Sequence, residues 1–318
     1  MKWESVVLLF FLMILVTSLS SAHEAHTVRE SETISIRSDG SIYPPTAPIS
    51  TVDNVTYTLA GNITNVFEGL DVERSNIVID GSGFALEGSG ADNSVGIILY
   101  RIGNVTIQNT CIKNFEYGID IENSSNNSIT GNNITNSGCG IYLVSSSDNN
   151  VSDNNLTNNV VGINLASSSK NNTISYNNIT ANNYAGIQLS STYNTVSGNS
   201  VTNNGRGIML VSSSDNTVSG NSVTNNTDGI VLLSSSNNTV YHNNFVNNTV
   251  QTDFFGGSLN VLDNGYPLGG NYWSDYNGTD VNHDGIGDTS YVIDTKNADN
   301  YPLMGTFYEF TVPRWYAI

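Results

Sequence analysis

Residues 207–228 read GIMLVSSSDNTVSGNSVTNNTD, and close variants of this segment recur along most of the chain. The pair Gly-Ile opens each copy, and the steps between successive pairs are 22, 22, 22, 24, 21 and 22 residues. The pairs begin at Gly96, Gly118, Gly140, Gly162, Gly186, Gly207 and Gly229. Self-similarity at a fixed period of this length is typical of solenoid proteins.

The apolar residues inside one copy have the spacing of strands. Ile208 and Leu210 alternate with Met209, and Val218 and Val223 each lie in a short β-prone stretch bounded by Ser, Asn and Gly. Helical spacing and the regular leucine frame of leucine-rich repeats are both missing from the repeat. We therefore predict an all-β fold, a single-stranded parallel β-helix of about 22 residues per coil, with coils about 4.8 Å apart.

Asparagine is the dominant polar residue, with 48 copies in 318 residues and none before residue 54. Equivalent points of successive coils carry Asn154, Asn199 and Asn221, and a second set consists of Asn158, Asn203 and Asn225. Asparagine suits turns, and amides stacked at one coil spacing can bond to each other, so both sets predict structural ladders. The glycine before each isoleucine is expected to allow a tight turn into the first strand.

Charge and composition exclude two classes of protein. The net charge is −18 although only 12% of residues are charged, so a polyanion such as nucleic acid is repelled. The abundance of Asn and Gly argues against a helical bundle. Much of the negative charge lies after Asp253, in the predicted C-terminal part of the chain.

The chain divides into four predicted segments. Residues 1–22 resemble a secretory signal peptide, with Lys2, an apolar run from Val6 to Val16, and Ala22 at the cleavage site. An uncleaved membrane anchor is the alternative, but this run is short for a span of about 20 residues. Residues 23–54 form a linker or N-terminal cap, 55–255 the β-helix, and 256–318 a C-terminal cap. The protein is thus expected to be exported, extracellular or at the cell surface, with no transmembrane segment after cleavage.

The C-terminal segment contains a calcium-type loop. Oxygen ligands at positions 1, 3, 5, 7 and 9 match the first part of a calcium-binding loop, with Gly285 at position 6. The expected ligands are Asp280, Asn282, Asp284, the carbonyl of Ile286, and Asp288. Position 12 is Tyr291 rather than Glu, so Asp294 could complete the shell. We predict a structural Ca²⁺ site, and a solvated acidic turn is the alternative.

The outward positions of the first strand in each coil share one face. The first column reads Ile98, Asp120, Tyr142, Asn164, Gln188, Met209 and Val231, and its neighbour reads Tyr100, Glu122, Val144, Ala166, Ser190, Val211 and Leu233. Tyrosine rings suit sugar stacking, so the candidate substrate-binding residues are Tyr100, Tyr142, Asn164 and Gln188. Ordinary surface residues on a β-prone face are the alternative.

Several motifs resemble those of NosD-type right-handed parallel β-helix proteins, which belong to the pectate-lyase-like group of carbohydrate-binding and sugar-hydrolysis domains. The segments are SNIVIDGSGF at 75–84, NVTIQN at 104–109, the Gly-Ile coils, and GNYWSDY at 270–276 continuing to Leu303. The tail is similar to that of exported prokaryotic, especially archaeal, members. The resemblance implies this fold and a substrate groove on the first-strand face. It leaves the activity open, because the group mixes enzymes with binding proteins.

Asp120 and Glu122 are the candidate catalytic residues, because paired carboxylates can act as acid and base in glycoside hydrolysis. Lys113 and Arg101 lie in the right coils for the base of a lyase, but no Arg or Lys column accompanies an Asp cluster, and the paired Asp of polygalacturonase-like hydrolases is missing. The NosD resemblance also implies copper delivery, but copper prefers Cys, Met and His. These residues are scattered along the sequence, at His23, His26, Cys111, Cys139, Met209, His242, His283 and Met304.

Copper is therefore not expected. The leading hypothesis is a protein that binds a polysaccharide or a cell-envelope glycan without catalysis. A polysaccharide lyase or glycoside hydrolase, and a periplasmic copper-delivery protein, are the alternatives. Cys111 and Cys139 lie 28 residues apart, out of step with the repeat, and the sequence leaves their pairing open.

Overall fold

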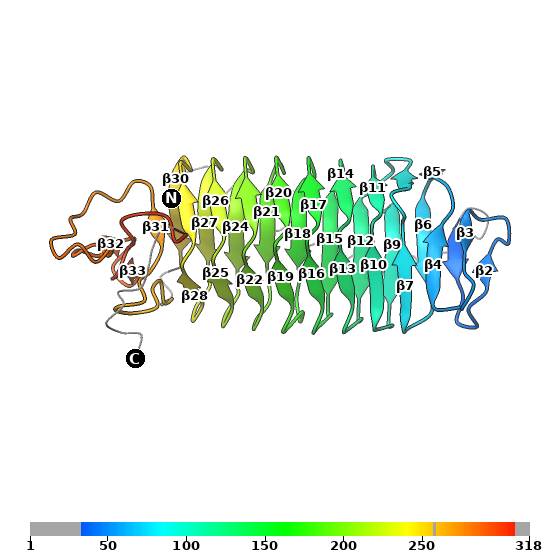
Figure 1. Ribbon diagram of the computed structural model, residues 1–318, viewed down its shortest axis with the longest axis horizontal. Helices are drawn as coiled ribbons and strands as arrows, with labels where there is room; N and C mark the ends of the chain where they lie inside the picture. Colours follow the sequence, from blue (N-terminus) through cyan, green and yellow to red (C-terminus); the bar gives the residue numbers. More distant parts are fainter. Residues whose placement is uncertain (1–32, 257–258, 309–318) are drawn as a thin grey trace.

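The computed structural model describes residues 33–256 and 259–308 and shows the predicted right-handed parallel β-helix. Figure 1 shows the coils stacked into a long rod, with the C-terminal residues gathered at one end. The predicted signal peptide lies outside the described residues. In the described part of the chain, no helix is long and apolar enough to cross a membrane.

Each coil contributes one strand to each of three sheets, here named A, B and C. Sheet A contains β1 (Ile34–Ile36), β2 (Ile42–Tyr43), β6 (Glu68–Val72), β9 (Val95–Tyr100), β12 (Tyr117–Glu122), β15 (Cys139–Val144), β18 (Val161–Leu165), β21 (Ala185–Leu189), β24 (Arg206–Val211), β27 (Asp228–Leu233) and β30 (Val250–Phe255). Sheet B contains β3 (Ile49–Ser50), β4 (Thr56–Leu59), β7 (Ile77–Asp80), β10 (Val105–Gln108), β13 (Ser128–Thr130), β16 (Asn150–Ser152), β19 (Thr173–Ser175), β22 (Thr195–Ser197), β25 (Thr217–Ser219) and β28 (Thr239–Tyr241). Sheet C contains β5 (Ile63–Val66), β8 (Ala85–Gly88), β11 (Cys111–Lys113), β14 (Asn133–Thr135), β17 (Asn155–Thr157), β20 (Asn178–Thr180), β23 (Ser200–Thr202), β26 (Ser222–Thr224), β29 (Asn244–Val246) and β31 (Tyr272–Trp273).

The core is a set of stacked aliphatic columns inside the coil. In the coil that starts at Gly207, Ile208 and Leu210 of sheet A, Val218 of sheet B and Val223 of sheet C are fully buried, as predicted. Each pairs in register with the equivalent residue of the next coil. Burial of each such side chain contributes roughly 1.5–3 kcal/mol, so the repeat carries its own core.

The glycine of each Gly-Ile pair lies within a strand of sheet A and makes no turn, so the predicted turn role was wrong. A Cβ at Gly118 would lie 2.5 Å from the carbonyl oxygen of Gly140 in the next coil and 2.7 Å from Ile134 Cγ2. Gly140 meets Gly162 and Leu156 in the same way. The glycine is therefore required by the close approach of neighbouring coils.

Asparagine side chains form ladders at the three turns of the coil, and Asn199 shows the pattern. Its Nδ2 donates to Asn221 Oδ1 at 2.9 Å and to the carbonyl of Ile174 at 2.9 Å. Its Oδ1 accepts from the backbone N and the Nδ2 of Asn177 at 2.9 and 3.0 Å. The B–C ladder comprises Asn132, Asn154, Asn177, Asn199, Asn221, Asn243 and Asn271. The A–B ladder comprises Asn127, Asn149, Asn172, Asn194, Asn216, Asn238, Asn260 and Asn297.

The second predicted asparagine set does not form a ladder. Asn158, Asn203 and Asn225 instead adopt positive φ angles of 59°, 58° and 56° in the turn before sheet A. Their neighbours Asn159, Asn204 and Asn226 carry the side-chain bonds. Asparagine tolerates left-handed backbone, so it serves two separate purposes at adjacent positions.

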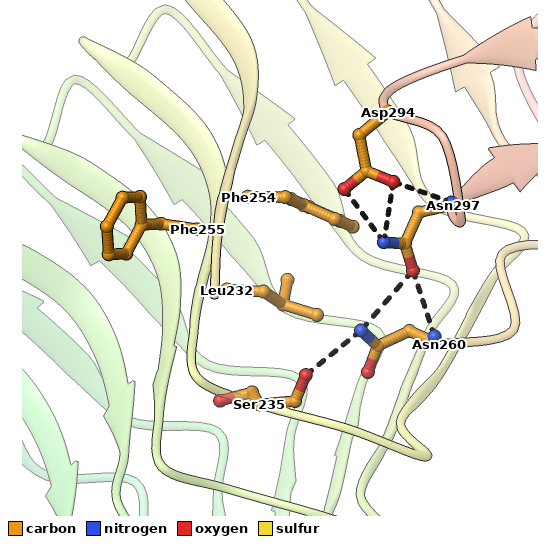
Figure 2. Close-up of a pocket in the computed structure, with 7 residues that line it drawn as sticks. All are labelled: Leu232, Ser235, Phe254, Phe255, Asn260, Asp294 and Asn297. Atoms are coloured by element: carbon orange, nitrogen blue, oxygen red, sulfur yellow. Dashed lines mark hydrogen bonds between the residues drawn. The ribbon is translucent and has the colours of Figure 1, made fainter. Parts of the chain in front are cut away.

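Two ladders end on carboxylates at the C-terminal end of the solenoid. Figure 2 shows Asn260 bonded to Asn297, whose Nδ2 donates to both oxygens of Asp294 at 3.0 and 2.9 Å. The B–C ladder ends where Asp299 accepts from the backbone N of Asn271 at 2.7 Å and from Trp273 Nε1 at 2.9 Å. Each amide donates toward the C-terminus, so the last one requires an acceptor, and these aspartates supply it.

The chain on either side of the coils covers both ends of the solenoid. At the N-terminal end, β1 extends sheet A, and β2 and β3 pair antiparallel with β1 and β4. At the other end, β31 extends sheet C, and β32 (Tyr291–Val292) pairs with β33 (Ala298–Asp299). Trp273 stacks between Phe245 and Tyr291 at centroid distances of 4.4 and 4.6 Å. These contacts cover the apolar edge of the last coil.

Candidate functional site

The outer face of sheet A carries the two columns expected from the repeat. Asp120 lies beside Ile98 and Tyr142 in neighbouring strands, and Glu122 lies beside Tyr100 and Val144. The first column continues in register through Asn164, Gln188, Met209 and Val231. The sequence interpretation therefore placed the candidate residues together on one face.

A third column on this face was missed. It consists of the residue before each Gly-Ile pair, namely Val95, Tyr117, Cys139, Val161, Ala185, Arg206 and Asp228. Val95, Tyr117, Cys139 and Val161 of this column pack with Tyr142 into a cluster separate from the main core. The rings of Tyr117 and Tyr142 lie 5.3 Å apart at 44°. Since the Gly-Ile pairs recur in register, the sequence could have identified the residues that precede them as a third column.

Exposure differs along the face. Tyr100 is 40% exposed, and Asp120 and Glu122 are partly exposed. Tyr142, Asn164 and Gln188 are only 9%, 5% and 7% exposed, so they are not the open surface residues that the sequence suggested. The face is therefore open at Tyr100 and Glu122 and becomes enclosed toward Gln188.

Three buried oxygens on this face have no hydrogen-bond partner within the described part of the chain. They are Asp120 Oδ1, Asn164 Oδ1 and Gln188 Oε1, and all belong to the first column. A buried polar atom left unpaired costs about 1–3 kcal/mol, so three in one column form an unusual arrangement. All three are acceptors, and they would bind a ligand that offers hydroxyl or N–H groups.

Asp120, one of the two candidate catalytic residues, has surroundings that shift its pKa. Burial, followed by the charge of Glu122, raises the pKa of Asp120 to about 7. Burial also raises the pKa of Tyr142, to which the charge of Asp120 adds. Two residues along a strand span about 6.6 Å, within the range that separates paired carboxylates in glycosidases. A carboxyl group with a raised pKa beside a second carboxylate can act as a general acid.

The acidic loop at the C-terminal end folds onto its own backbone. Asp280 accepts from the backbone N–H groups of Asp284 and Gly285 at 3.1 and 2.9 Å, and Asp288 accepts from that of Val281 at 2.7 Å. Asn282 donates to Asp284 at 2.9 Å, and Asp284 accepts from the backbone N of Ile286. Asp294 bonds Asn297 at the ladder end. Calcium at this loop stays a prediction.

The residues that copper would require are separated. His242 Nε2 lies 2.8 Å from the Leu268 carbonyl, and its ring stacks on Phe307 at 4.1 Å. Cys111 lies in sheet C and Cys139 on the outer face of sheet A, and both thiols are free. Within residues 33–256 and 259–308, no group of three or more His, Cys, Asp or Glu side chains is placed to hold a metal ion. The described donor set does not fit a copper centre.

Comparison with known proteins gives one family and several similar folds. The sequence model of the family described as periplasmic copper-binding protein (NosD) matches residues 51–278. No protein of curated function matches the sequence. A double mutant of the periplasmic alginate epimerase AlgG superposes with a TM-score of 0.50 and 19% identity, over 64% of this chain and 63% of that one.

The enzymatically active domain of tailspike protein 2 from bacteriophage CBA120 is also similar. It gives a TM-score of 0.54 and 15% identity, over 76% of this chain and 42% of that one. This chain thus matches less than two thirds of the length of either structure. At these identities the similarity concerns the fold alone.

Proposed function

Since the chain belongs to the NosD family, we propose that it is an exported β-helix protein that binds a polysaccharide or cell-envelope glycan along the outer face of sheet A, without catalysis. Export is supported by the signal-like sequence at residues 1–22 and by the periplasmic location in the family's description. Copper delivery is not proposed, because the described donor set does not fit a copper centre.

The observation that carries this proposal is the column of unpaired acceptors beside tyrosine rings. Asp120, Asn164 and Gln188 present oxygens without partners, and Tyr142 lies between the first two in the same column. Sugar hydroxyls donate hydrogen bonds, and the apolar faces of sugar rings stack on aromatic side chains. The similar folds include an alginate epimerase and a phage tailspike, in keeping with a glycan ligand.

A panel of polysaccharides assayed for both binding and cleavage tests the proposal. We expect retention of at least one glycan without release of reducing ends or unsaturated sugars. Tyr142→Ala and Gln188→Ala should each weaken binding by about tenfold, the loss expected for one stacking contact or hydrogen bond. Tyr193→Ala is the matched control, because Tyr193 is exposed in the turn before sheet B. Absence of binding to every glycan would exclude the proposed function.

One observation favours a second candidate, a glycoside hydrolase. The raised pKa of Asp120 beside Glu122 is the electrostatic arrangement of an acid with its partner carboxylate. If the protein cleaves a polysaccharide, the Asp120→Asn/Glu122→Gln variant should lose that cleavage. Cleavage that persists in this variant would remove the pair as the catalytic site.

A further inference from the structure

The charges on the outer face of sheet A are almost all of one sign. Its strands contribute six carboxylates, at Glu68, Asp71, Asp120, Glu122, Asp228 and Asp253. They contribute one basic side chain, Arg206. All seven residues occupy outward columns, as their register with Val95, Ile98 and Tyr100 shows.

The basic groups near the face already have other contacts. Arg206 Nε lies 3.7 Å from Asp228 Oδ2, and its guanidinium lies 4.8 Å from the centre of the Tyr184 ring. Lys113 forms an ion pair at 3.0 Å with Glu87 in sheet C. Arg101 follows β9 in the turn, and its guanidinium lies 4.9 Å from the centre of the Tyr100 ring. The sheet A strands that contain the three unpaired oxygens therefore carry no Lys or Arg. These oxygens are Asp120 Oδ1, Asn164 Oδ1 and Gln188 Oε1.

We propose that the ligand of this face is a neutral, hydroxyl-rich glycan and that polyuronates are rejected. The inference rests on the proposed function and names its substrate class. A uronate carries a carboxylate, which only accepts, in place of the primary hydroxyl, so it offers fewer donors to the three unpaired oxygens. It would also bring negative charge beside Asp120 and Glu122, and like charges across a binding surface cost affinity. A neutral sugar instead donates hydroxyl hydrogens to these oxygens without repulsion.

A matched pair of ligands tests this selectivity. The neutral polysaccharide that binds most tightly is oxidised at its primary hydroxyls to carboxylates, which changes charge but not linkage. Binding of both forms is measured by calorimetry with chelator present. We expect the oxidised form to bind at least about tenfold more weakly at low ionic strength, with a smaller difference at high salt because screening shortens the repulsion.

Charge variants test whether the outer face of sheet A causes the rejection of polyuronates. Asp120→Asn/Glu122→Gln makes both side chains permanently neutral but keeps acceptor oxygens, so the ratio of the two dissociation constants, measured above pH 7, should fall below about threefold. Asp148→Asn/Asp153→Asn is the matched control, because both residues are exposed in turns with φ of 59° and 58°, which asparagine also adopts. This control should leave the ratio unchanged. The salt dependence of the unaltered protein tests the same repulsion without relying on the folding of any variant.

The possible outcomes distinguish selectivity for neutral glycans from glycan binding itself. Tighter binding of the oxidised form, or of natural polyuronates, would overturn neutral selectivity while leaving glycan binding intact. Uronate binding that appears only with calcium would also overturn it, because the carboxylates would then act through a bridging cation. Failure to bind any glycan, neutral or acidic, would remove the proposed function and this inference together.

Discussion

The B–C ladder and the first column of the outer face of sheet A are built on the same repeat, yet their polar side chains have opposite surroundings. In the ladder, the oxygen and nitrogen of Asn199 are bonded to the coils on both sides and to a backbone carbonyl. In the outer column, the oxygens of Asn164 and Gln188 are buried without a partner. A stacked amide is therefore structural where its neighbours complete it, and it lacks a protein partner where they do not.

The identity of the neighbouring coils explains this contrast. The ladder repeats asparagine at every coil, so each amide finds an acceptor above and a donor below. The outer column changes residue type at each coil, from Asp120 to Tyr142, Asn164, Gln188 and Met209. Mixed side chains cannot form a continuous chain of bonds, so the repeat that stabilises the turns leaves this column unpaired.

The largest expected effect is on the ladder. Asn199→Ala would leave the backbone N–H of Asn177 without its acceptor, and it would remove the hydrogen bonds of Asn199 to Asn177 Nδ2 and to the carbonyl of Ile174. At about 1–3 kcal/mol for the unpaired N–H and about 1 kcal/mol for each other lost hydrogen bond, the free energy of unfolding should fall by about 3–5 kcal/mol. Denaturant unfolding measures this loss. Ser200→Ala, at the exposed neighbouring position, is the control and should change stability by less than about 0.5 kcal/mol.

Truncation of an amide in the outer column should change the stability little and the glycan affinity strongly. Asn164→Ala removes an oxygen that has no partner, so the free energy of unfolding should change by less than about 1 kcal/mol. Glycan affinity, in contrast, should fall by about tenfold. Parallel unfolding and binding measurements check both values. If the Asn164 variant lost as much stability as the Asn199 variant, the contrast between the two columns would be wrong.

Titration should separate the two kinds of carboxyl group. The pKa of Asp120 is raised to about 7 by burial and then by Glu122, whereas hydrogen bonds, first from the backbone N of Lys296, lower the pKa of Asp294. Stability from Asp120 is therefore complete below about pH 4 and is lost as pH rises through 7, whereas stability from Asp294 is lost as pH falls below its ordinary value of 3.8. Carboxyl NMR would show both midpoints. Glu122→Gln should lower the midpoint of Asp120, and an unchanged midpoint would exclude coupling between them.

Calcium should have the smallest effect, confined to the C-terminal segment. If the loop from Asp280 to Asp288 binds Ca²⁺, addition of the ion should raise the melting temperature by a few degrees and slow proteolysis of this segment. Asp280→Ala should abolish the response, whereas Asp92→Asn, exposed near the other end, should retain it. An identical melting curve with calcium and with chelator would contradict a calcium site.

The repeat made most of the architecture predictable. The spacing of Gly-Ile pairs placed Ile208 and Leu210 inside, and the strand register confirms the columns of the outer face, although Met209 in the first column is fully buried rather than exposed. Two errors share a cause. The first concerns the role of Gly118, and the second concerns which of Asn203 and Asn204 forms the side-chain hydrogen bonds. Both depend on how closely one coil approaches the next. The spacing of the repeat along the sequence does not predict the distance between the side chains and backbone of neighbouring coils.

The site was predicted less completely. The columns identified which residues share a face, but not that Tyr142, Asn164 and Gln188 are enclosed or that three oxygens lack partners. These properties depend on side-chain volumes in three adjacent columns, including the Tyr117 and Cys139 column that the sequence interpretation did not consider. The aspartates that end the ladders were also missed, because Asp294 and Asp299 lie outside the repeat.

The ladders make the solenoid adjustable in length by whole units. Removal of residues 207–228 would join Arg206 to Gly229, and Asn199 would then meet Asn243 where it now meets Asn221. The removed coil and the coil that takes its place offer the same hydrogen-bond partners. The rod should therefore fold about 4.8 Å shorter, with both ends still covered. Gene duplication or deletion in this register would lengthen or shorten the outer face of sheet A without redesign of either end.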